Sequence, residues 1–221
     1  MRALFCGTAA RVRGFSLRHG RALCAGPAFG AVTSQQEAMA EIVGLFGKNG
    51  DTLYDTSVTQ LQHALQTAAL AQSESGADAD VCAALLHDIG HLALDEHMDA
   101  EDGFLEEDLE HERVGSLFLR RCFGDDVTRP VDLHVEAKRY LCATRDGYWD
   151  ALSNSSKRSL EVQGGAFTAE EAEAWITQDG AEAAVRLRLW DDCAKVQDLD
   201  TPPLDAFLGA VERCVTLPAQ A

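Results

Sequence analysis

The stretch Leu85-Leu86-His87-Asp88-Ile89-Gly90-His91 decides how the rest of the chain is interpreted. It continues an apolar run that begins at Val81, which is typical of a buried helix. Neighbouring residues on a helix point about 100° apart, so His87 and Asp88 could both reach one ion beside it. His91 follows one turn after His87 on the same face. Imidazole and carboxylate suit iron, manganese, zinc or magnesium, and a carboxylate can bridge two ions. The same dipeptide would also fit a buried helix end at which His87 and Asp88 hydrogen-bond to each other.

The apolar pattern outside this stretch predicts further helices and no strands. Apolar positions recur at helical spacing, and clusters of Gly, Pro and Ser separate the segments. One helix, which begins at Asp78 or Asp80, carries both His87 and Asp88. Pro130 is expected to begin another helix. The other predicted helices cover about residues 34–46, 58–73, 111–123, 158–162, 168–178, 181–195 and 204–215. The chain is therefore predicted to fold as an all-α bundle.

Length and composition indicate one globular domain with a short extension. The 221 residues suffice for one sizeable core, and 46% hydrophobic with 25% charged residues is ordinary for a soluble protein. The sequence contains no run of about 18 apolar residues, which is the length that would be needed to span a membrane. The formal net charge of -17 argues against nucleic-acid binding, which needs a basic surface. Seven scattered Cys without a CxxC pair favour reduced thiols, and therefore a soluble, intracellular protein.

Residues 1–35 differ from the rest of the chain, because they contain five Arg and no Asp or Glu. An Arg-rich, acid-free N-terminus with Ser, Ala and Gly resembles a mitochondrial or plastid transit peptide. A disordered basic leader or a misassigned start would look the same. We expect residues 1–35 to be a leader and residues 36–221 to form the domain. The acidic segment from Leu94 to Glu110 is either a lid over a site or a solvated connection.

Six residues with metal-binding side chains are distributed over the predicted helices. Because His87 and Asp88 share one helix, the set occupies five helices, and bundles build metal sites from side chains on facing helices. One ion needs only four ligands, so two ions that share Asp88 account for the set better than one. Nitrogen and oxygen ligands with open positions suit iron or manganese better than structural zinc. The predicted ligands are His63, His87, Asp88, His111, His134 and Asp191.

Longer segments around these residues resemble a known family. The segments are 58–67 (VTQLQHALQT), 86–91 (LHDIGH), 133–142 (LHVEAKRYLC), 159–165 (SLEVQGG) and 187–195 (LRLWDDCAK). Over about residues 36–217 the chain resembles the HD-domain mixed-valence di-iron oxygenases of phosphonate degradation, the family typified by 2-amino-1-hydroxyethylphosphonate dioxygenase. The resemblance implies an HD-domain helical bundle with a di-metal site in its core.

The resemblance also implies roles for individual residues. The cofactors would be two iron ions, Fe(II) and Fe(III), with O2 as co-substrate. One iron would bind His63, His87, Asp88 and Asp191, and the other Asp88, His111 and His134. Asp88, His91 and Lys138 would be catalytic. The substrate would contact Tyr54, His91, Lys138, Ser159, Gln163 and Arg188. Independently of the resemblance, Lys138 and Arg188 are the cations that a phosphonate dianion needs, although they could instead neutralise nearby carboxylates.

The implied reaction is O2-dependent cleavage of the C–P bond of a small-molecule hydroxyphosphonate. 2-Amino-1-hydroxyethylphosphonate would give glycine and phosphate, and its N-trimethyl analogue would give glycine betaine and phosphate. The family has a Tyr followed by a Gly-Glu-Pro-like turn, where this chain has Tyr54-Asp55-Thr56-Ser57 without the Glu. This departure concerns the gate at the iron and the recognition of the substrate's amine, and it leaves the six predicted ligands untouched.

Two other functions fit the same ligands. A metal-dependent HD phosphohydrolase, acting on a nucleotide or another phosphoester, would use its ions to activate water. Such a hydrolase would work without oxygen and with manganese or magnesium, whereas the oxygenase would not. A non-catalytic HD-like binding protein is the third function, and the six intact ligands argue against it. No sequence feature specifies an oligomeric state.

Overall fold

The computed structural model describes residues 29–55, 57–94 and 110–217. Over these ranges the chain forms eleven helices, and its only β pairings are two isolated bridges, so the all-α prediction is confirmed. Residues 1–28 of the expected leader and residues 95–109 of the acidic segment lie outside the described residues. Among the helices described, none has the length and apolar character needed to cross a membrane.

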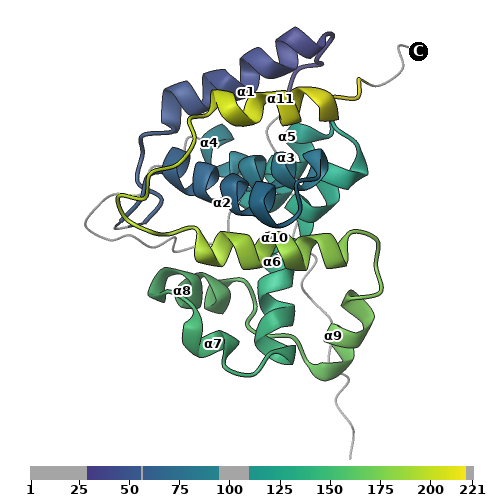
Figure 1. Ribbon diagram of the computed structural model, residues 1–221. Coiled ribbons are helices and arrows are strands. Elements are labelled where there is room, and N and C mark those ends of the chain that lie inside the picture. Colours follow the sequence, from purple (N-terminus) through teal and green to yellow (C-terminus); the bar gives the residue numbers. More distant parts are fainter. Residues whose placement is uncertain (1–28, 56, 95–109, 218–221) are drawn as a thin grey trace, which may run out of the picture.

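Figure 1 places helices α1 and α11 at one end of the molecule and α7, α8 and α9 at the other, with α3, α6 and α10 between them. In chain order the helices are α1 (Gln35–Asn49), α2 (Gln60–Glu74), α3 (Asp78–Leu86), α4 (Ile89–Ala93), α5 (His111–Leu119), α6 (Asp125–Thr144), α7 (Tyr148–Ala151), α8 (Asn154–Val162), α9 (Ala169–Trp175), α10 (Ala181–Cys193) and α11 (Asp205–Cys214).

Side-chain caps fix where several helices begin. The Ser34 hydroxyl accepts a hydrogen bond from a backbone N–H in the first turn of α1. Thr59 and Gln62 form a reciprocal capping box at the start of α2, and Thr168 and Glu171 form another at the start of α9. Such caps satisfy backbone N–H groups that have no partner within the helix. The helix that carries His63 therefore has a fixed N-terminus close to the site.

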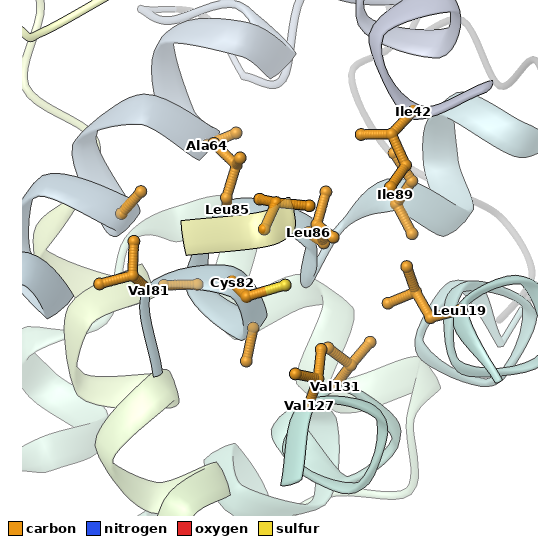
Figure 2. Packing of buried hydrophobic residues seen from close by; sticks show 14 of the residues in the cluster. Ile42, Ala64, Val81, Cys82, Leu85, Leu86, Ile89, Leu119, Val127 and Val131 are labelled. Atoms are coloured by element: carbon orange, nitrogen blue, oxygen red, sulfur yellow. The ribbon is translucent and has the colours of Figure 1, made fainter. Parts of the chain in front are cut away.

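Helix α3 lies at the centre of the main hydrophobic core, and every residue from Val81 to Leu86 is buried. Figure 2 shows Leu86 and Ile89, one on each side of the end of α3, together with Ile42 and Leu119. Burying a leucine side chain contributes about 1.5–3 kcal/mol. This packing holds the C-terminal end of α3 in place, and the predicted metal ligands begin at that end.

His87 and Asp88 do not share a helix, which corrects the prediction. They lie at the break between α3 and α4, where Asp88 has φ -100° and ψ 15°. Gly90 gives the physical reason, because a Cβ atom there would lie 1.9 Å from the carbonyl oxygen of His111. Helix α4 therefore approaches the start of α5 more closely than any other residue type would allow. This close approach accompanies the break between α3 and α4.

The starts of two other helices differ from the predictions. Pro130 does not begin a helix, because α6 begins five residues earlier and includes it. Neither Asp78 nor Asp80 caps α3, whose N-cap is Ala77 without a side-chain hydrogen bond. Val32, which precedes the predicted start of the domain at residue 36, is also buried in the core.

Candidate metal centre

The six predicted ligands come from five helices or helix junctions and all are buried. Two lie at the α3–α4 break, one at the first residue of α5, and one each within α2, α6 and α10. The structure brings five of them together in two groups of three that share Asp88. In each group the potential ligand atoms lie within 4.8 Å of one another. The groups are His63, His87 and Asp88, and Asp88, His111 and His134.

Each oxygen of the Asp88 carboxylate faces a different pair of histidines. Its Oδ2 atom lies 3.5 Å from Nε2 of His63 and 3.1 Å from Nε2 of His87. Its Oδ1 atom lies 3.4 Å from Nε2 of His111 and 3.5 Å from Nε2 of His134. A carboxylate in this position can bridge two metal ions, each bound by one histidine pair.

The other ring nitrogens of the histidines fix which atoms face inward. His63 Nδ1 lies 2.6 Å from the carbonyl oxygen of Ala194. His87 and His134 make similar Nδ1 contacts of 2.9 and 2.7 Å with carbonyl oxygens in their own helical segments. A carbonyl can only accept, so each Nδ1 carries the proton. Each Nε2 then presents a lone pair to the centre, as metal-binding histidines do.

The short distances between inward-facing nitrogens fit metal ions better than hydrogen bonds. Nε2 of His63 lies 3.2 Å from Nε2 of His87, and Nε2 of His111 lies 3.3 Å from Nε2 of His134. Two unprotonated nitrogens cannot hydrogen-bond to each other, but their lone pairs can converge on one cation. The donor set of imidazoles with one shared carboxylate therefore fits a pair of metal ions, and iron is among those it suits.

Asp191 of α10 adjoins the first group through His63. Its Oδ1 atom lies 3.2 Å from Nε2 of His63 and is a buried oxygen without a hydrogen bond, whereas its Oδ2 atom lies 2.7 Å from Arg188 Nη1. Burial opposes ionisation of Asp191, but Arg188, Lys195 and His63 outweigh it and hold the pKa of this carboxyl well below its usual range. One oxygen is thus held by a cation while the other faces the histidine pair.

Local charges keep the centre ready for metal ions. Burial opposes ionisation of Asp88, but the surrounding histidines outweigh it and hold the pKa of the carboxyl well below its usual range. Burial and repulsion by His91 lower the pKa of His111 to about 3, and burial also lowers the pKa of His134. Burial opposes protonation of His63, but the contacts of its Nε2 atom with Asp191 and Asp88 raise its pKa to about 9, so a metal ion that binds there would displace a proton from Nε2. The second pair is therefore neutral, which is the form that binds a metal.

Aromatic rings cover both histidine groups. Tyr54, which precedes α2, stacks on His63 with ring centroids 3.9 Å apart. His91 of α4 stacks on His111 at the same separation. Burial, Asp191 and Asp88 raise the pKa of the Tyr54 phenol well above its usual value. Both residues were predicted to contact substrate, and both lie against a predicted ligand.

A group of buried cations lies beside Asp191, on the side of α8. Lys138 is 2% exposed, and its Nζ atom donates a 2.8 Å hydrogen bond to Ser159 Oγ. Burial and repulsion by Arg188 lower the pKa of Lys138 to about 7. Arg188 is 4% exposed, and its Nε atom is buried without a hydrogen bond. Gln163 Oε1 is likewise buried without a partner.

Sequence reasoning missed several residues that complete this part of the site. Lys195 contacts Asp191 and Ser156, and Tyr148 donates a hydrogen bond to Asp192. Asp192 also pairs with Arg188. The position of Lys195, one turn after Asp191, was the available signal.

Comparisons with known proteins identify the family. A model of the HD domain matches residues 61–163, a span that contains five of the six predicted ligands but not Asp191. The chain is 45% identical over 179 residues to hydroxymethylphosphonate dioxygenase of Gimesia maris (strain ATCC 29201 / DSM 8797 / 534-30), covering 81% of this chain and 89% of the relative. It is 37% identical over 175 residues to [1-hydroxy-2-(trimethylamino)ethyl]phosphonate dioxygenase (glycine-betaine-forming) of Leisingera caerulea, covering 79% of this chain and 88% of the relative.

The chain belongs to the HD-domain phosphonate dioxygenases. Membership in this family confirms the predicted resemblance, the helical HD fold and the assignment as an oxygenase. A metal cofactor agrees with the buried cluster of histidines and Asp88. The assignment of individual residues to metal and substrate stays a prediction.

Proposed function

We propose that this dioxygenase cleaves the C–P bond of a small 1-hydroxyphosphonate with O2, and that its preferred substrate is hydroxymethylphosphonate. The reaction consumes one hydroxymethylphosphonate dianion and one O2, and it releases formate, hydrogen phosphate and one proton. The C–P bond breaks, the carbon is oxidised to the level of a carboxylate, and O2 is reduced. The observation that carries the proposal is the double histidine site around Asp88, which lies beside the cations of α6 and α10.

Two iron ions are the cofactors that we assign to this centre. His63, His87, Asp88 and Asp191 would hold one ion, and Asp88, His111 and His134 the other. When bound, the metal pair supplies the redox chemistry that the activation of O2 requires. The protein contributes geometry, since Asp88 has one oxygen for each histidine pair and backbone carbonyls orient three of the imidazoles.

The phosphonate would bind among Lys138, Arg188, Ser159 and Gln163. Lys138 and Arg188 are almost fully buried in a protein whose net charge is -17, and burial strengthens their attraction for an anion. The unpartnered Nε of Arg188 supplies a spare donor. Lys138 already contacts Ser159, so a phosphonate oxygen could be shared between the two side chains. The same cations would stabilise the phosphate that leaves when the C–P bond breaks.

Two features support a substrate without an amine. The relative that is 45% identical is named for hydroxymethylphosphonate, and the relative named for the trimethylamino compound is 37% identical. Near Tyr54, the carboxylate of Asp55 is used within its own turn, where it accepts hydrogen bonds from Ser57. Asp192 is engaged by Tyr148 and Arg188. Both carboxylates already have partners within the protein, so we expect 2-amino-1-hydroxyethylphosphonate and its trimethyl analogue to be poorer substrates.

The test is O2 uptake measured together with the release of phosphate and formate. Iron-loaded, mildly reduced protein would receive hydroxymethylphosphonate, and parallel samples would receive the amino and trimethylamino compounds. We expect equal amounts of O2 consumed and of phosphate and formate released, with the highest kcat/KM for hydroxymethylphosphonate. Phosphate release without O2 uptake would replace the proposal by a hydrolase. A higher kcat/KM for either amine compound would refute the substrate assignment and leave the C–P oxygenase.

A further inference from the structure

Lys195 is a partly buried lysine just beyond the C-terminal end of α10, and its side chain is 11% exposed. Its Nζ atom lies 3.4 Å from Asp191 Oδ1 and donates a 3.2 Å hydrogen bond to Ser156 Oγ. It also lies 5.4 Å from the centroid of the Tyr54 ring, within the range of a cation–π contact. Lys195 therefore touches a predicted metal ligand, the first turn of α8 and the ring that covers His63.

The contact with Asp191 involves the oxygen that faces the metal centre. Oδ1 is the atom that lies 3.2 Å from His63 Nε2, whereas Oδ2 is paired with Arg188. Lys195 thus contacts the carboxylate on its metal-facing side, and Arg188 holds the opposite oxygen. A lysine ammonium suits this place, because it has three donors and can contact several acceptors at once.

The contact with Ser156 continues through α8 to the predicted phosphonate site. Ser159 donates a 3.1 Å hydrogen bond to the carbonyl oxygen of Ser156, and it accepts one from Lys138. The chain of contacts therefore runs from Asp191 through Lys195, Ser156 and Ser159 to Lys138. The links from Lys195 to Ser156 and from Ser159 to Lys138 join residues that lie far apart in the sequence. The other two links each span about one helical turn. It connects the metal side of the site with the anion side.

We propose that Lys195 is a positioning residue that fixes α8 relative to the metal ligand Asp191, and so sets where the phosphonate binds relative to the metal pair. This inference rests on the proposed function. Lys195 acts through Ser156 and Asp191, and its removal leaves Arg188 on Asp191, so the metal ions stay bound. The substrate instead loses the correct placement of Ser159 and Gln163 on α8.

The test compares Lys195→Met with Lys157→Met, which removes a lysine of α8 whose Nζ donates to the carbonyl of Asp150 instead. Both changes alter the net charge equally. Titration calorimetry of iron-loaded protein with hydroxymethylphosphonate under argon measures binding without turnover. Charged hydrogen bonds are worth about 1.5–3 kcal/mol, so Lys195→Met should weaken binding by about ten- to a hundredfold. The iron content and the affinity of Lys157→Met should match those of the wild type.

A cycle with Ser156→Ala separates positioning from simple charge attraction. If Lys195 acts through Ser156, both single variants weaken binding, and the double variant binds no worse than Lys195→Met. Fully additive losses, or a Ser156→Ala variant with wild-type affinity, would overturn the proposal. So would Lys195→Met protein that binds hydroxymethylphosphonate normally, even if its melting temperature falls. If the wild type itself fails to bind the compound, the proposed function fails rather than the role of Lys195.

Discussion

Lys138 offers the sharpest quantitative test of the phosphonate site. Burial, Arg188 and Lys195 lower the pKa of its ammonium to about 7, against some opposition from Asp191. A bound phosphonate dianion favours the charged form, so binding above this pKa requires the uptake of a proton. Lys138→Met keeps most of the apolar stem and removes the charge. A charged hydrogen bond is worth about 1.5–3 kcal/mol, so the variant should bind about ten- to a hundredfold more weakly below the pKa.

This advantage of the wild type should disappear as the pH rises. The depressed pKa means that the free protein loses the Lys138 proton above about pH 7, and each further unit costs about 1.4 kcal/mol, or tenfold in affinity. A hundredfold advantage would therefore vanish by about pH 9. The assay is calorimetric binding of hydroxymethylphosphonate under argon, expressed as the ratio of the dissociation constants of variant and wild type.

The ratio of dissociation constants does not depend on the titration of the phosphonate itself, because that titration changes the affinity of both proteins equally. The iron content of the variant should stay normal, since Lys138 is not among the predicted ligands. A ratio of one at about pH 6 would remove Lys138 from the phosphonate site. A large ratio that stays constant to about pH 9 would show that Lys138 binds the anion but does not titrate near neutrality, which would refute the reasoning from burial.

Four further predictions test the metal centre and the packing of the helices. Metal analysis after dialysis should find about one iron per chain in His134→Ala and close to none in Asp88→Asn, because only Asp88 belongs to both groups of ligands. Two ions bound to Asp88→Asn would exclude a bridging role for this carboxylate. Chelation should lower the melting temperature, and added ferrous iron should restore it, because ligand at a hundredfold excess over Kd stabilises a native state by about 2.7 kcal/mol. Gly90→Ala should cost about 3 kcal/mol or more in urea unfolding, because the new Cβ would meet the backbone of His111 at 1.9 Å. Gly44→Ala, where a Cβ would have no neighbour within 4 Å, should instead stabilise α1 by up to about 1 kcal/mol.

The sequence predicted most of the helices and a set of metal-binding side chains distributed over them, for local reasons. Apolar spacing and caps such as Ser34 and Thr168 act within one or two turns, so they can be read from a short window. The histidines stood out because one per helix is hard to explain by other means. Their pairing could not be read in this way, because it depends on how α2, α3, α5 and α6 pack.

Lys195 shows why other parts of the site were missed. A lysine after the last turn of a helix is ordinarily exposed, and the one local signal was its position one turn after Asp191. Its burial accompanies a contact with Ser156 of α8, a residue 39 positions earlier in the chain. The contact between Tyr148 and Asp192 spans 44 positions and is equally hidden. These residues become recognisable only when the fold brings α7 and α8 to the C-terminal end of α10.

The wrong prediction of a shared helix for His87 and Asp88 leads to the central feature of the site. On a continuous helix Asp88 would point about 100° away from His87 and would face one side of the centre. At the break between α3 and α4 its two oxygens instead face the histidines of α2 and α3 on one side and those of α5 and α6 on the other. Gly90 makes this break possible, because it lets α4 lie against the start of α5. The glycine in the motif therefore belongs to the local geometry that lets the Asp88 carboxylate lie between the two histidine pairs.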